Sequence, residues 1–292
     1  MRQLTVPLLL AIAIGCGGAE PTGSTRPVLS VASSLPPHAW MVERLGGEAI
    51  ASESVLGPTD SPATYQPDDA QVSRLLSSRI VFRAGVPFES GSWFDALEQH
   101  LPVVDLRDGV ALRPIAEPET GGGRHHHDHG ALDPHTWLSP ARLIIQAQRI
   151  SSALEDLDPG HGETYRARLV ELTRELEDLD RWIHELLAPH RGRTFVVFHP
   201  SWGYFADDYG LRQLAIEVDG KVPSDAQISR LQRRARELGI TVVFVQPQIA
   251  GQSLHAVAGS IGARVETLDP LAADVIANLR QTATKIAGSF DG

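Results

Sequence analysis

Histidine is the residue of this sequence whose abundance and spacing point to chemistry. The chain of 292 residues contains 12 histidines and a single cysteine. Four of the histidines, His125, His126, His127 and His129, lie in one tract with glycines on both sides. Neutral imidazole is the commonest protein ligand for transition metals, and such tracts are typical of metal binding. The tract therefore predicts a metal-collecting loop, the alternative being a solvated loop without a ligand.

Two further histidines and an aspartate lie where a metal site could form. His135 lies in a turn that leads into a predicted helix at Ala141, and His199 and Asp269 each end a predicted strand. In open α/β sheets, residues just past the carboxyl ends of parallel strands line the ligand crevice. Taken singly, each has a structural alternative, such as a helix cap for Asp269. Together, two imidazoles and a carboxylate favour zinc over magnesium or calcium.

The elements that must position these residues alternate between short β-branched segments and helical stretches. The predicted strands are Val28–Ser33, Glu53–Leu56, Ile80–Ala84, Val103–Leu106, Thr194–Phe198, Leu214–Val218, Thr241–Val245 and Arg264–Leu268. The helices expected between them include His38–Leu45, Asp68–Leu76 and one that begins at a capping box formed by Ser224 and Gln227. Strands separated by helix-length segments predict parallel sheets. The fold class is therefore α/β, with two lobes of parallel strands flanked by helices.

A long helix is expected between the two halves. Its apolar residues recur at intervals of four and three: Tyr165, Leu169, Leu172, Leu176, Leu179, Ile183 and Leu186. Pro159 and Pro189 mark its ends. A coiled-coil partner would satisfy the same periodicity, but we favour a helix packed against both lobes, which would limit hinge bending. The predicted units are residues 27–157 for the first lobe, 158–190 for the linking helix and 191–292 for the second lobe.

The amino terminus predicts export. Arg2 is followed by the apolar run Leu4–Ile14, which is shorter than the ~20 residues that span a bilayer and is typical of a signal peptide. Small residues precede Cys16, as in a bacterial lipobox, although Ala13 replaces the usual leucine. We predict a signal peptide over 1–15, lipidation of Cys16 and a flexible tether over 16–26. The alternative is an ordinary cleaved signal; either way the protein is periplasmic or on the cell surface.

Composition excludes several other classes of protein. A length of 292 residues predicts roughly two domains. One cysteine excludes a disulfide framework and Cys-rich zinc sites. A net charge of −10 argues against a nucleic-acid partner.

Several motifs are shared with a known family. They are Asp133-Pro134-His135-Thr136-Trp137, the segment Phe198–Phe205, Tyr209-Gly210-Leu211, the segment Gly220–Ser224 and Leu268-Asp269-Pro270-Leu271. By these motifs the sequence, from about Val28 to its carboxyl end, resembles the cluster A-I zinc- and manganese-binding solute proteins of bacterial ABC uptake systems.

The resemblance implies a fold, a site and partners. It implies two lobes joined by one long rigid helix, with a metal site in the cleft between them. By this match His135, His199 and Asp269 are ligands, and the tract from His125 to His129 is an accessory loop. The implied cargo is zinc, with manganese as the alternative, and no catalysis is implied. The implied partners are an ABC permease with its ATPase and, through the anchor, a membrane; we expect a monomer.

One ligand of the family is missing. The family's first ligand is a histidine in a turn that here reads Ser61-Pro62-Ala63-Thr64-Tyr65, and Ala63 has no donor atom. Gln246 also stands where many relatives have a glutamate. Zinc prefers four ligands, so three outcomes are open. Water completes the site; a histidine replaces the lost one, either His38 or a member of the tract; or high-affinity binding is lost and the fold serves another role.

Two alternative functions follow from the missing ligand. One is an interaction lipoprotein on the same fold, either an adhesin or a sensor. The other is a zinc hydrolase, because zinc with an open position lowers the pKa of bound water to about 7. A hydrolase needs a base near the metal, and Glu89 is the candidate, with a surface position or a cap as its alternative role.

Overall fold

The computed structural model describes residues 28–115, 132–217, 224–249 and 252–291, without the side chains of 252–255. The predicted signal peptide, Cys16, the tether and the four-histidine tract lie outside the described residues. Within the described part of the chain, no helix is long and apolar enough to cross a membrane.

Two separate parallel sheets confirm the predicted fold class. The first sheet has the order β2-β1-β3-β4, and the second has the order β6-β5-β7-β8. The strands are β1 (Leu29–Ser33), β2 (Ile50–Ser54), β3 (Val81–Arg83), β4 (Val103–Asp105), β5 (Thr194–Val197), β6 (Arg212–Ala215), β7 (Val242–Val245) and β8 (Arg264–Thr267). All eight predicted strands are present. β2 begins three residues earlier than expected, and β6 ends at Ala215 rather than at position 218.

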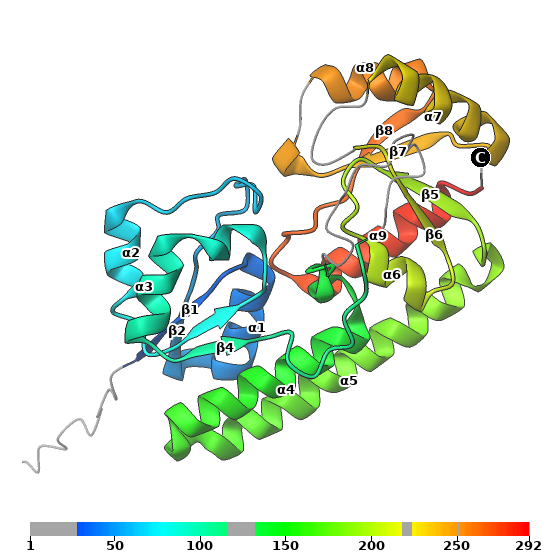
Figure 1. Cartoon of the computed structure of the whole chain (residues 1–292). Helices are drawn as coiled ribbons and strands as arrows, with labels where there is room; N and C mark the ends of the chain where they lie inside the picture. Colours follow the sequence, from blue (N-terminus) through cyan, green and yellow to red (C-terminus); the bar gives the residue numbers. More distant parts are fainter. Residues whose placement is uncertain (1–27, 116–131, 218–223, 250–251, 292) are drawn as a thin grey trace, which may run out of the picture.

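The helices cover the sheets as the sequence pattern requires. They are α1 (Pro36–Gly46), α2 (Asp69–Leu75), α3 (Ser92–His100), α4 (Pro140–Leu157), α5 (Gly162–Leu187), α6 (Gly203–Asp208), α7 (Asp225–Leu238), α8 (Gln252–Ser260) and α9 (Val275–Gly288). α7 begins at the predicted capping box, where the Ser224 backbone N–H donates to Gln227 Oε1 at 2.8 Å. Figure 1 shows the two lobes side by side above the helical pair α4 and α5.

The sheet of the second lobe is buried on both faces. Successive residues of β5 point to opposite sides. Phe195 and Val197 belong to the core shared with α5 and α9, while Val196 belongs to a second core under α7 and α8. A parallel strand covered on both sides needs an unbroken apolar run, which explains the fully buried sequence of β7.

The long helix is α5, and its apolar stripe is buried within this chain. Tyr165, Leu172, Leu176, Leu179 and Ile183 are all buried. α5 packs against α4 and α1 and also against α9 of the second lobe. One hydrophobic core therefore runs from the first sheet through α5 to one face of the second sheet. The stripe is satisfied by helices of the same chain, as we favoured over a coiled-coil partner.

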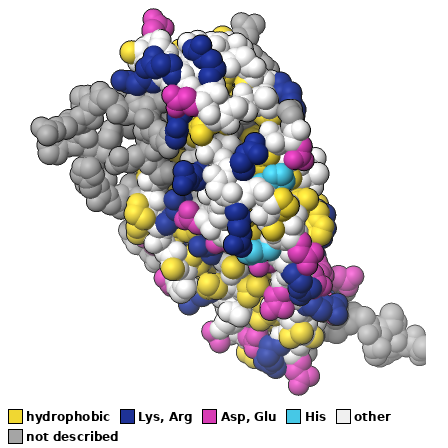
Figure 2. Space-filling view, turned by 90° about the vertical axis from the view of Figure 1, so that its right-hand side faces the viewer, with side chains coloured by type: hydrophobic (Ala, Val, Ile, Leu, Met, Phe, Trp, Pro, Cys, Tyr) yellow, Lys and Arg dark blue, Asp and Glu magenta, His cyan; other side chains and the backbone are white. Residues whose placement is uncertain are grey.

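Charged side chains are distributed unevenly on one face of the molecule. On the face seen in Figure 2, Lys and Arg side chains are spread along the length of the molecule, whereas Asp and Glu side chains are most frequent toward its lower end.

Candidate metal site

The carboxyl edge of the second sheet carries a polar residue after every strand. Glu217 follows β6, His199 follows β5, Gln246 follows β7 and Asp269 follows β8. Because the strands are parallel in the order β6-β5-β7-β8, these four residues lie along one edge in that same order. The edge therefore places His199 between Glu217 and Gln246.

His199 is held by a carboxylate. Its Nδ1 lies 2.6 Å from Glu217 Oε1, and Glu217 is only 7% exposed. A carboxylate accepts, so Nδ1 carries the hydrogen, and in the neutral ring with this tautomer the lone pair is on Nε2. A carboxylate on the far nitrogen orients a metal-binding imidazole and raises its basicity. His199 is thus prepared to bind a metal ion through Nε2.

His135 has the same arrangement on the other side of the site. It precedes a short 3-10 helix (Thr136–Leu138), and its Nδ1 lies 2.8 Å from Oδ1 of the fully buried Asp133. Burial lowers the pKa of His135, while the hydrogen bond to Asp133 opposes this shift. The net lowering favours a neutral ring, whose Nε2 is then available as a ligand.

The two imidazoles are close enough to share one metal ion. Their ring centroids are 5.3 Å apart, with an interplanar angle of 74°. A ring bound through Nε2 at about 2.0–2.1 Å places its centroid about 3.2 Å from the metal, so two rings at a tetrahedral angle have centroids about 5.2 Å apart. The observed separation between His135 and His199 therefore fits two ligands of one tetrahedral ion.

Asp269 lies nearby but does not complete a cluster. Its Oδ1 accepts hydrogen bonds from the Leu271 backbone N–H and from Gln248 Nε2, both at 2.9 Å. β7 separates its strand from that of His199, so the two strand ends are about 9.6 Å apart at ~4.8 Å per strand. Trp137 Nε1 donates to Pro270 O at 2.6 Å, which ties the His135 turn to the Asp269 turn.

The structure thus unites two of the three predicted ligands. Across the described residues, no group of three or more His, Cys, Asp or Glu side chains is placed to hold a metal ion. The assignment of Asp269 as a ligand stays a prediction. Ala63 is exposed in its turn and offers no donor. Gln246 is 8% exposed and lines a small hollow together with His199.

His38 packs against the turn that carries His135. It is fully buried in α1, its ring meets the edge of Trp137 with centroids 5.9 Å apart, and burial lowers its pKa to about 4. His38 Nε2 lies 3.3 Å from Gln146 Oε1, and Gln146 Nε2 donates to Thr136 Oγ1 at 2.7 Å. In this arrangement the ring braces the turn that carries His135. Its predicted role as a replacement ligand stays a prediction.

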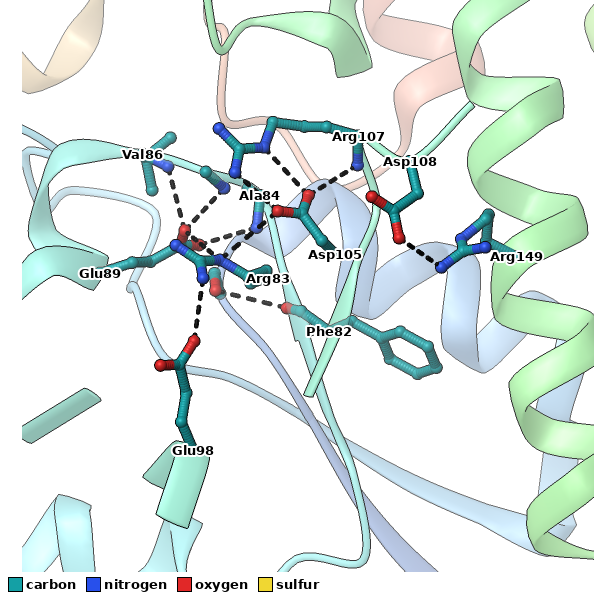
Figure 3. Close-up of polar contacts among 12 residues, drawn as sticks. Phe82, Arg83, Ala84, Val86, Glu89, Glu98, Asp105, Arg107, Asp108 and Arg149 are labelled. Carbon is teal, nitrogen blue, oxygen red and sulfur yellow. Dashed lines mark hydrogen bonds and ion pairs between the residues drawn. The ribbon is translucent and has the colours of Figure 1, made fainter. Parts of the chain in front are cut away.

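Glu89 has a structural role in the first lobe. It is 2% exposed, and its carboxylate accepts the backbone N–H groups of Ala84, Gly85 and Val86 at 2.7, 2.6 and 3.1 Å. Figure 3 shows this carboxylate inside a polar network that includes Arg83. Burial raises the pKa of Glu89, and the hydrogen bonds from Ser34 and the backbone oppose this. Both carboxylate oxygens are therefore used to cap the turn after β3.

The comparisons with known proteins decide the family. The model of the family described as periplasmic zinc-uptake complex component A (ZnuA) matches residues 31–288. The chain belongs to this family. Extracytoplasmic metal capture for uptake, as expected from the motifs, is confirmed at the level of the family, and so is export. Its relatives are metal-binding transport proteins.

Individual relatives of this ZnuA-family chain agree. A high-affinity zinc uptake system protein ZnuA from Yersinia pestis is 27% identical over 273 residues, covering 85% of this chain and 84% of that protein. The manganese-binding lipoprotein MntA of Bacillus subtilis is 25% identical over 254 residues, covering 83% and 79%. A crystal structure of ZnuA matches with a TM-score of 0.81 at 35% identity, covering 90% of this chain and 99% of that one.

The sequence pattern did not predict the carboxylates that contact the Nδ1 atoms of His135 and His199. Asp133 stands two residues before His135, a spacing that allows a short turn closed by its side chain. Glu217 was expected inside a strand that extends to position 218. Because β6 ends at Ala215, Glu217 instead lies past the strand end and faces His199.

Replacing Glu217 by alanine is expected to weaken zinc binding by about 10–100-fold, because His199 loses the group that fixes its tautomer and orientation. Glu217→Gln keeps an acceptor oxygen and should lose less. Zinc titration by calorimetry measures both, with Glu237→Ala as a control on an exposed acidic residue of α7. Equal affinities for Glu217→Ala and the control would contradict this role.

Proposed function

We propose that this protein captures a divalent transition metal, zinc in preference to manganese, outside the cytoplasm and delivers it to an ABC permease. The observation that carries the proposal is the pair His135 and His199, with ring centroids 5.3 Å apart and a carboxylate on each Nδ1. Two imidazoles prepared in this way suit zinc better than hard cations. Asp269, at the same sheet edge, is the third protein ligand that we propose.

The shared core supports a nearly rigid site. His135 belongs to the segment before α4, whereas His199 belongs to the second lobe, and Tyr204 Oη donates to Asp133 O at 2.8 Å across the boundary. Glycine at position 203 leaves room for this contact, because a Cβ atom there would clash with Arg113 Nη1 and would lie 2.8 Å from Asp133 Oδ2. The two histidines therefore already lie close together without a metal ion, which supports a low ordering cost of capture.

The anchor and the partners are part of the proposal. A lipid on Cys16 would hold the protein at the membrane surface and raise its effective concentration near the permease and its ATPase. The protein would act as a monomer, with residues 16–26 as the tether. The two alternatives, an interaction lipoprotein and a zinc hydrolase, have less support. Glu89, the candidate base, has both carboxylate oxygens engaged by backbone N–H groups.

Calorimetric titration of the purified protein with Zn²⁺ and with Mn²⁺ tests the proposal. We expect zinc to bind more tightly than manganese, with a stoichiometry of about one once the histidine tract is removed. The absence of zinc binding tighter than about 10 μM would contradict capture. Tighter binding of manganese would overturn the choice of cargo.

Restoring the missing ligand should strengthen the site. Ala63→His is expected to tighten zinc binding at least tenfold, about 1.4 kcal/mol, because it adds an imidazole to a site with three proposed protein ligands. Thr64→His places an imidazole on the neighbouring exposed residue and serves as the control. Unchanged affinity in Ala63→His would mean that another residue already fills this coordination position.

A further inference from the structure

The loop that carries Ala63 contacts the second lobe, although its position 63 supplies no side-chain ligand for a metal ion. It connects β2 to α2, and Figure 1 shows it along the top of the first lobe. The side chain of Ala63 has no donor atom, so a bound ion cannot hold this loop through a side chain at position 63. The structure holds the loop by a different contact, which involves Pro58.

Gln248 makes this contact. It lies in the short 3-10 helix after β7 (Pro247–Ile249), at the edge of the second sheet. Its Nε2 lies 2.9 Å from Pro58 O and 2.9 Å from Asp269 Oδ1. A primary amide has two N–H donors, and here one is directed to each acceptor. One side chain therefore joins the first-lobe loop to the carboxylate that we propose as a ligand.

The orientation of the Gln248 amide is determined by its acceptors. A carbonyl and a carboxylate oxygen both require a donor, so Nε2 and not Oε1 must face them. Oε1 is buried and makes no hydrogen bond with the described residues. An amide that leaves its oxygen unpaired keeps this orientation only because both N–H bonds favour it, and the bond to the charged Asp269 is the stronger one.

Both ends of this connection are held by further hydrogen bonds. Asp269 Oδ1 also accepts the Leu271 backbone N–H at 2.9 Å, and Asn278 Nδ2 donates to Asp269 O at 2.7 Å. On the loop side, the Gly57 backbone N–H donates to Asp60 Oδ2 at 2.9 Å, which closes a tight turn around Pro58. Between two segments held in this way, the exposed hydrogen bond from Gln248 to Pro58 O can make the modest net contribution of one hydrogen bond to their relative position.

We propose that Gln248 is a positioning residue that fastens the loop of residues 57–65 to Asp269 by hydrogen bonds. These bonds replace the link through the metal that a ligand at position 63 would provide. The loop is consequently held against the second lobe before metal binds. Asp269 is held with Oδ1 engaged, which leaves Oδ2 to receive the cargo. The second part rests on the proposed function, whereas the fastening itself concerns the metal-free protein.

Hydrogen exchange of residues 57–65 in the metal-free protein tests the fastening. In Gln248→Leu, exchange in this loop is expected to rise at least about fivefold, with other regions unchanged. Gln248→Glu has nearly the same volume but no N–H donors. It should show the same rise in exchange of residues 57–65, and it provides the test if the leucine variant folds poorly. The matched control is Gln232→Leu, which removes a similar bond, from Nε2 to Ser260 O at 2.9 Å, in the same lobe. Exchange that stays at the wild-type rate in both Gln248 variants would overturn the proposal.

Zinc provides a second readout that a merely stabilising residue would not change. In the wild-type protein, exchange of residues 57–65 should be the same with and without zinc. In the double variant Ala63→His, Gln248→Leu, the loop should be fast without zinc and slow with it. A double variant insensitive to zinc, although calorimetry shows zinc bound, would overturn the proposal. If zinc does not bind the wild type at all, the proposed function fails, while the metal-free comparison still decides whether Gln248 fastens the loop.

Discussion

Replacement of His199 by alanine is expected to weaken zinc binding by at least about 100-fold, equivalent to about 2.8 kcal/mol. His199 supplies one of the two imidazoles that the structure brings together, with its ring centroid 5.3 Å from that of His135. Its removal leaves one imidazole and a more distant carboxylate, and it also leaves the buried Glu217 without its partner. A site with so few ligands cannot offset the hydration of the free ion.

Calorimetry or competition with a chromogenic chelator measures this loss. His184→Ala is the matched control, because His184 lies on α5 with its side chain 42% exposed and its ring against Tyr209. The control should bind zinc within about threefold of the wild type. If His199→Ala also stays within that range, the metal is bound elsewhere, and the described histidine pair is not the capture site.

Replacement of Leu176 by alanine is expected to destabilise the protein by about 2–5 kcal/mol. Leu176 is fully buried on α5, in the single core that joins both lobes. Its truncation loses the free energy gained by burying the leucine side chain. It also leaves a cavity, because the neighbouring side chains from the two lobes relax only partly into the space. Because the core is shared, both lobes should lose stability, and the two should unfold in one transition.

Urea unfolding followed by far-UV circular dichroism measures this effect. Val170→Ala is the control on the same helix, because Val170 is 69% exposed and should change stability by less than about 0.5 kcal/mol. Two separated transitions in Leu176→Ala, with only one of them shifted, would show that the lobes are stabilised independently. That outcome would contradict a core that is continuous through α5.

The local pattern of the sequence determined the elements of this protein. Alternating β-branched and helical segments predicted all eight strands, and the heptad-like spacing from Tyr165 predicted α5. These features depend on neighbours within a few residues, so periodicity and capping signals are sufficient. The same pattern placed His199 and Asp269 just past strand ends, where an α/β sheet presents its ligands.

The tertiary structure alone decided how these residues meet. Strand order placed β7 between the strands of His199 and Asp269, which separates two residues that the motifs treat as members of one site. Because β6 ends at Ala215, Glu217 lies past the strand and contacts His199. His38 is buried against the edge of Trp137. Gln248 meets Pro58 across 190 positions of sequence. Such contacts depend on register and on the packing of distant segments, which a single sequence pattern does not encode.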